Sequence, residues 1–125
     1  MSLLHYRELI AWQKSMTLVS RVYALSKAFP GNERFGLTSQ VRRAAISVPS
    51  NIAEGQGRDS IREFLHHLSI AYGSLMEVET QVLIGLDLGY LDKESVSAFL
   101  NGSSEVGRII NGLMRSLRKQ LTTDH

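Results

Sequence analysis

Cysteine is absent from this chain of 125 residues, proline occurs twice, and aromatic residues make up 7% of the sequence. Without cysteine there is no disulfide, no thiolate nucleophile and no cysteine-based zinc site, as is typical of a reducing cytoplasm. No apolar run approaches the roughly 20 residues that span a bilayer. Residues 1–8 lack the basic and apolar regions of a signal peptide. We therefore expect a cytoplasmic protein with no membrane partner.

Charge is nearly balanced overall, at +2, but it is unevenly distributed. Residues 1–75 carry nine Lys or Arg against five Asp or Glu, residues 76–105 carry one against six, and residues 106–125 carry four against one. Ten of the fourteen cations are arginine, whose planar fork suits phosphate and carboxylate groups. The alternative is that helices of opposite charge pair side by side or across subunits.

Apolar residues recur at spacings of three and four in four segments, which predicts four helices and no strand. We expect the helices over about residues 5–28, 38–55, 60–88 and from 92 towards the C-terminus. Thr38, Ser60 and Asp92 are the predicted N-caps, and glycines mark the ends of the second and third helices. Four helices with short connections predict an all-α, antiparallel up-down four-helix bundle that forms a single domain over residues 1–125.

Pro49 lies about three turns into the second predicted helix. Because proline lacks the backbone donor and crowds the carbonyl four residues earlier, we expect a kink or a break there. Ser47 and Asn51 are placed to satisfy the backbone groups that Pro49 frees.

Two features favour self-assembly. The first helix carries two apolar stripes, Trp12-Met16-Val19-Tyr23 and Ile10-Leu18-Val22-Leu25, which exceeds what one face of a monomeric bundle needs. The last helix contains Gly102, Gly107 and Gly112, each costing about 1 kcal/mol relative to alanine, so it must depend on packing. A wider buried face inside a monomer is the alternative.

One continuous pattern resembles a known family. It comprises Phe29-Pro30, Glu33, Phe35-Gly36-Leu37, Gln40, Arg42-Arg43-Ala44-Ala45, Ser47, Asn51-Ile52-Ala53-Glu54-Gly55, Arg58, Phe64, Ile70-Ala71-Tyr72-Gly73-Ser74, Glu77, Gln81 and Leu88-Gly89-Tyr90. Over residues 8–91 the chain resembles the small four-helix bundle proteins encoded in intervening sequences of bacterial 23S ribosomal RNA genes. The same fold group includes the accessory variability proteins of diversity-generating retroelements.

The resemblance implies a bundle that assembles into a ring-shaped homopentamer, no catalysis, and a nucleic-acid role as a nucleoprotein-accessory module. The expected partners are therefore other copies of the chain and RNA or DNA. A protein-interaction scaffold without nucleic-acid contact is the alternative, and the acidic residues 76–105 would then be its docking surface.

Basic residues in two regions are candidate phosphate contacts: Arg42 and Arg43 with Arg58 and Arg62, and Arg115 and Arg118 with Lys119. In the first region the alternative is that Arg43 pairs with a carboxylate such as Glu54 or Glu77. In the second, the alternative is a solvated helix end that favours the helix dipole.

A polar stripe at helical spacing comprises Gln40, Arg43, Ser47, Asn51 and Glu54. We favour a hydrogen-bonded seam between subunits over a surface that faces a ligand or channel.

The sequence has few residue patterns that are typical of catalytic or metal-binding sites. Glu63 and His66 have the Glu-x-x-His spacing of di-iron bundles, but the chain contains no second such motif. We therefore predict no catalytic residue, metal, cofactor or small-molecule substrate.

Overall fold

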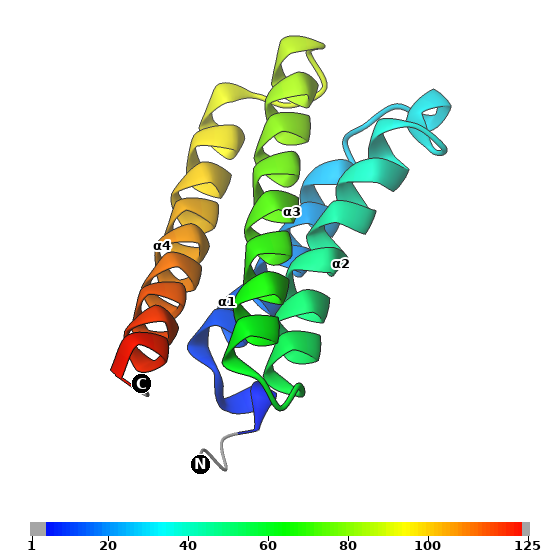
Figure 1. The fold of residues 1–125 in the computed structure, drawn as a ribbon. Coiled ribbons are helices and arrows are strands. Elements are labelled where there is room, and N and C mark those ends of the chain that lie inside the picture. The colour runs from blue at the N-terminus through cyan, green and yellow to red at the C-terminus, as the bar shows by residue number, and fades with distance from the viewer. Residues whose placement is uncertain (1–4, 124–125) are drawn as a thin grey trace.

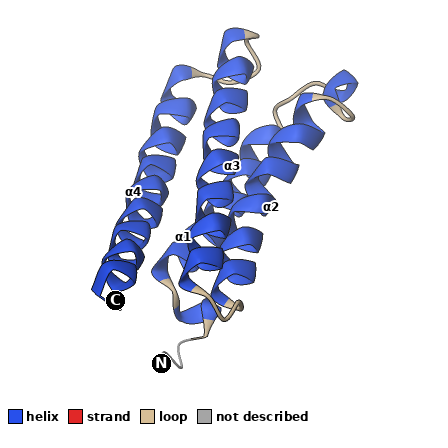
Figure 2. Ribbon diagram, viewed as in Figure 1, coloured by secondary structure: helices blue, strands red, loops and turns tan. Residues whose placement is uncertain are grey.

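The computed structural model describes residues 5–123, and every regular element in that range is helical (Figure 2). The elements in chain order are the 3-10 helix η1 Tyr6–Glu8, α1 Ile10–Ser26, the 3-10 helix η2 Gly31–Glu33, α2 Leu37–Gln56, α3 Ile61–Asp87 and α4 Lys93–Thr123. Residues 1–4 and 124–125 lie outside the described residues, although the predicted domain and the signal-peptide prediction include some of them.

Successive long helices run in alternating directions and are joined by short turns (Figure 1). Each helix packs against two neighbours, because α1 contacts α2 and α4 while α3 also contacts α2 and α4. The all-α prediction is confirmed, and the arrangement is that of an up-down four-helix bundle. Within residues 5–123 no helix is both long enough and apolar enough to cross a bilayer.

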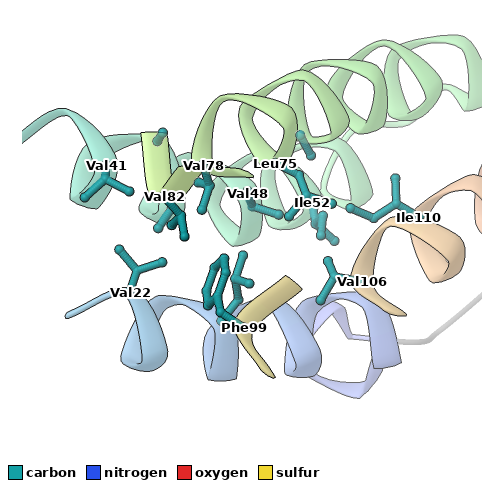
Figure 3. Close-up of a cluster of buried hydrophobic side chains, with 14 of the residues drawn as sticks. Val22, Val41, Val48, Ile52, Leu75, Val78, Val82, Phe99, Val106 and Ile110 are labelled. Carbon is teal, nitrogen blue, oxygen red and sulfur yellow. The ribbon is translucent and has the colours of Figure 1, made fainter. Parts of the chain in front are cut away.

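All four long helices contribute side chains to one hydrophobic core (Figure 3). Its fully enclosed members include Val22 of α1, Ile52 of α2, Leu75 of α3 and Ile110 of α4, each no more than 1% exposed. The predicted buried faces of the second and third helices are confirmed in their central turns, where valine, leucine, isoleucine and alanine repeat every three or four residues.

The first helix differs from its prediction in start and in buried face. The chain forms η1 first, capped by His5, and Leu9 is extended, so α1 begins at Ile10. The residues of α1 that face the core are Ala11, Ser15, Leu18, Val22 and Ser26. Small serines are accommodated there because each hydroxyl donates to a backbone carbonyl of its own helix. In the stripe that contains Met16 and Tyr23, these two side chains are exposed, whereas Trp12 and Val19 are partly buried against the core.

The second helix begins at Leu37, with Gly36 at the N-cap position, so the prediction that Thr38 is the N-cap is wrong. The carboxylate of Glu33 instead accepts a hydrogen bond from the Leu37 backbone N–H at 3.1 Å. The helix continues through Pro49 without a break. Asn51 Nδ2 donates to the carbonyl of Ser47 at 2.9 Å, rather than to the Ala45 carbonyl that the proline leaves unpaired.

The other two predicted caps are confirmed. Ser60 Oγ accepts from the Glu63 backbone N–H at 3.2 Å, and Asp92 Oδ1 accepts from the Ser95 N–H at 2.7 Å. Gly89, just beyond α3, has φ +82°, a conformation that L side chains rarely adopt, so it ends the helix as predicted.

Gly55 does not mark the end of α2, because it is buried inside the helix. A Cβ at this position would lie 2.7 Å from His67 Cβ and 3.0 Å from Phe64 Cδ1. Gly55 therefore permits the close approach of α2 and α3. Gly107 of α4 is less crowded, because a Cβ there would lie at the ordinary contact distances of 3.4 Å from Leu75 Cδ2 and 3.5 Å from Tyr72 Cε1.

Candidate nucleic-acid interface

A surface groove of about 490 Å³ lies along the first half of α2, between Tyr23 of α1 and the segment that precedes α2. Its lining residues are Tyr23, Arg34, Phe35, Thr38, Ser39, Arg42, Arg43 and Ile46. Three of them are arginines and none is acidic. The groove thus combines a concentrated positive charge with exposed apolar side chains.

Arg42 is held in place by two contacts with α1. Its Nε donates to Ser26 Oγ at 2.8 Å, and its guanidinium lies 4.5 Å from the centroid of the Tyr23 ring. These contacts orient the guanidinium and leave its terminal nitrogens without an ion-pair partner among the described residues. An Arg fork that is already oriented loses little entropy when it binds a phosphate or a carboxylate.

Arg34, Phe35 and Arg43 are exposed on the groove. Phe35 has 86% of its surface exposed, and the Arg34 guanidinium lies 5.2 Å from its ring centroid. Within residues 5–123, neither Arg34 nor Arg43 forms an ion pair. The Arg43–Glu54 and Arg43–Glu77 pairs considered from the sequence are therefore not formed within the chain, and no carboxylate among the described residues compensates the three positive charges.

Glu33 fixes the segment that carries Arg34 and Phe35. Its two carboxylate oxygens accept from the Leu37 backbone N–H at 3.1 Å and from the Tyr90 hydroxyl at 2.8 Å. The Leu37 N–H, and secondarily the Tyr90 hydroxyl, lower the pKa of Glu33, while the same carboxylate raises the pKa of Tyr90. An ionised Glu33 thus ties the rim of the groove to the turn between α3 and α4.

Arg58 and Arg62 are not brought to the groove. Arg58 follows the opposite end of α2 from Arg42 and Arg43, about 20 Å away along the helix axis. Arg58 pairs with Glu54 at 2.9 Å and with Glu63 at 3.5 Å, so its charge is locally neutralised. Arg62 is exposed in the first turn of α3. The four arginines that the sequence grouped together therefore belong to two separate places.

The second predicted basic group, Arg115, Arg118 and Lys119, is exposed near the C-terminal end of α4. This end of the bundle lies away from the start of α2, where the groove is (Figure 1). The structure therefore offers two distinct basic regions, and only the groove combines arginines with an exposed aromatic ring.

Most of the predicted polar stripe on α2 faces α3 of the same chain. Ser47 Oγ lies 2.8 Å from Ser74 Oγ, and Asn51 Oδ1 lies 3.2 Å from His67 Nδ1. Glu54 Oε2 lies 4.0 Å from His67 Nε2. Ser47, Asn51 and Glu54 thus have partners within the chain, on α3 or, for Glu54, also just beyond α2, and the seam between subunits stays a prediction.

Sequence reasoning missed Tyr23, Arg34 and Phe35 as members of the site. The apolar spacing places Tyr23 in an apolar stripe, and Phe35 occurs in the sequence analysis only as part of the family pattern. The available signal was an Arg-Phe pair just before the basic half of a helix. Within residues 5–123 no group of three or more His, Cys, Asp or Glu is arranged to hold a metal ion.

Comparisons with known proteins agree with the resemblance noted from the sequence. A family model described as 23S rRNA-intervening sequence protein matches residues 7–112, which include most of α4. A 1.70 Å crystal structure from Bacteroides thetaiotaomicron VPI-5482, of a protein with unknown function from the S23 ribosomal protein family, is similar with a TM-score of 0.77. The similarity covers 84% of this chain and 98% of that chain at 23% identity, and it shows a shared fold. No curated protein matches the chain significantly.

Proposed function

The chain belongs to the 23S rRNA-intervening sequence protein family, and from that premise we propose that it is a cytoplasmic, non-catalytic protein that binds nucleic acid. The observation that carries the proposal is the groove in which Arg34, Arg42 and Arg43 have no carboxylate partner among the described residues. Uncompensated arginines favour polyanions, because each phosphate they neutralise releases condensed counterions. Because the net charge is only +2, we propose that nucleic acid binds at a localised site and not, independently of sequence, over the whole surface.

Replacing both exposed arginines of the groove, in an Arg34→Ala/Arg43→Ala variant, is expected to weaken binding of short RNA or DNA about tenfold at low salt. The slope of the logarithm of the association constant against the logarithm of salt concentration should become shallower by about one for each phosphate that the variant no longer neutralises. Fluorescence anisotropy across a salt series measures both quantities.

The matched control is Arg115→Ala/Arg118→Ala, which removes two exposed arginines from the far end of α4 and should change affinity much less. Arg58→Ala should also have little effect, because Arg58 is already paired with carboxylates. Absence of binding by the wild-type protein at low salt would overturn the proposal. Equal reductions of affinity in the groove variant and the α4 variant would show that the groove is not the binding surface.

We also propose that the chain assembles with copies of itself, as the ring-shaped homopentamer that the resemblance implies. Outside the groove, several large apolar side chains are at least 40% exposed: Ile10, Met16, Ile70, Leu83, Ile84 and Leu88. Ile84 of α3 and Leu88, the C-cap residue of that helix, are four residues apart and point to the same side. Apolar groups gathered on one face are typical of a surface that a partner covers.

Light scattering coupled to size-exclusion chromatography is expected to give five times the 14.0 kDa mass of one chain. An Ile84→Glu substitution should reduce that mass, because it places a charge on the apolar face of α3, whereas Arg115→Ala should leave it unchanged. A monomer at micromolar concentration would contradict the proposed assembly.

A further inference from the structure

We infer that the groove accepts an unpaired nucleotide, whose base stacks on Phe35 and whose phosphates contact Arg42 and Arg43. The inference rests on the nucleic-acid binding proposed above and names its substrate class, which is single-stranded RNA or DNA, including unpaired loops. Phosphate binding alone is indifferent to strandedness, so the additional argument comes from the aromatic side chain and from the shape of the site.

Phe35 contributes little to the hydrophobic core, because 86% of its surface is exposed. Its position is nevertheless defined, since it lies between η2 and α2 in the segment that Glu33 ties to Tyr90. The Arg34 guanidinium lies over the ring, with 5.2 Å to the centroid, and adds positive charge to the aromatic surface. An exposed ring on a fixed segment beside arginines is the arrangement that stacks successive bases in single-strand binding proteins.

The phosphate contacts come from α2, which also lines the groove. Arg42 is oriented by Ser26 and Tyr23, and Arg43 is exposed one residue further along α2. Thr38 and Ser39, in the first turn of α2, also line the groove and add hydroxyl donors at the positive end of the helix dipole. The sugar-phosphate backbone of a base stacked on Phe35 would thus have several hydrogen-bond donors of the protein beside it.

Stacking favours a single strand over a double helix at this site. The groove volume of about 490 Å³ accommodates a nucleotide or two. A paired base is stacked on both faces within its own helix, and aromatic side chains therefore stack on bases of loops, bulges and single strands. Phe35 could contact only the outside of a duplex, where its ring would gain no stacking.

The test is binding of the full chain to labelled oligouridylate, oligothymidylate, an abasic single strand of the same length, and RNA and DNA duplexes. The abasic strand retains every phosphate but has no base to stack. Phe35→Ala is expected to weaken binding of the two base-containing single strands about tenfold. It should leave the affinity for the abasic strand and for the duplexes unchanged.

Two further variants separate stacking from apolar contact. Phe35→Trp retains a stacking surface and should bind like the wild type, whereas Phe35→Leu retains apolar bulk and should behave like Phe35→Ala. Because Phe35 is mostly exposed, all three variants should keep the helical circular dichroism of the wild type. Similar reductions for oligouridylate and oligothymidylate would assign the site to unpaired bases in general, and a reduction confined to one of them would assign it to RNA or to DNA.

The outcomes distinguish this inference from the proposal on which it rests. If Arg34→Ala/Arg43→Ala weakens binding while Phe35→Ala does not, the protein binds nucleic acid but the stacking inference is overturned. An equal effect of Phe35→Ala on the abasic strand or on duplexes overturns it as well. Displacement of oligouridylate by polyglutamate as readily as by unlabelled oligouridylate would assign the groove to acidic proteins instead. No binding to any of the nucleic acids would remove both conclusions.

Discussion

Substitution of Leu75 by alanine is expected to lower the free energy of unfolding by about 3 kcal/mol or more. Leu75 is 0% exposed and belongs to the core that all four long helices share (Figure 3). A Cβ at Gly107 would lie at an ordinary contact distance of 3.4 Å from Leu75 Cδ2, so the leucine packs against α4 at this glycine. Its removal leaves a cavity between α3 and α4 in addition to the loss of buried apolar surface. Urea unfolding followed by circular dichroism, at one fixed protein concentration, measures the change.

The matched control is Leu88→Ala, which removes the same atoms from a side chain that is 54% exposed. Its effect on the free energy of unfolding should stay within about 0.5 kcal/mol when both variants are compared below the protein concentration at which chains associate. A small effect of Leu75→Ala would mean that the helices collapse around the cavity, and the core would then not be the close-packed layer described above.

Substitution of Gly55 by alanine is expected to lower the free energy of unfolding by about 2 kcal/mol, because overpacking of a core costs about 1–3 kcal/mol. Alanine in place of glycine inside a helix normally stabilises by up to about 1 kcal/mol. Here a Cβ would lie 2.7 Å from His67 Cβ, an atom that cannot move without its helix, so α2 and α3 would have to separate. The overpacking therefore outweighs the gain in helix propensity. A Gly55→Val variant should be destabilised further.

Gly57→Ala provides the matched control, two residues further along the chain. Gly57 has φ −75°, which alanine adopts freely, and a Cβ there would make ordinary contacts of 3.5 and 3.6 Å. This substitution should be neutral or stabilise by about 0.5 kcal/mol, because it reduces the entropy of the unfolded chain. Stabilisation by Gly55→Ala comparable to that of Gly57→Ala would contradict the close approach of α2 and α3.

The bundle was predictable from the sequence because apolar spacing reports local geometry. The core faces of α2 and α3 follow the three-four pattern, and the Ser60 and Asp92 caps depend on residues only three positions away. The start of α2 was not predictable in the same way. Glu33 caps Leu37 while it also binds Tyr90, which is 57 residues distant, so long-range packing decides which residue begins the helix.

The candidate site was predictable only in part. Adjacent arginines on a helix point about 100° apart, so helix geometry alone predicts different surroundings for Arg42 and Arg43. Arg42 indeed contacts α1, whereas Arg43 is exposed, yet both line one groove. The pairing of Glu54 with Arg58, rather than with Arg43, depends on how the chain turns after α2. Because the sequence does not reveal the path of the chain after α2, it does not show which arginine lacks a carboxylate partner.

The sequence by itself determined the helical class of this protein, three of its four long helices to within a few residues, most of its core and its family, because these follow from periodicity, caps and a continuous motif. Only the tertiary structure decided which polar residues face a neighbouring helix and which remain open to a ligand. Ser47 and Asn51 form hydrogen bonds with side chains of α3. The side chains that line the groove include Arg34, Phe35, Arg42 and Arg43. Burial and charge compensation are properties of the whole packed molecule, since both depend on residues that are distant in the chain and adjacent in space.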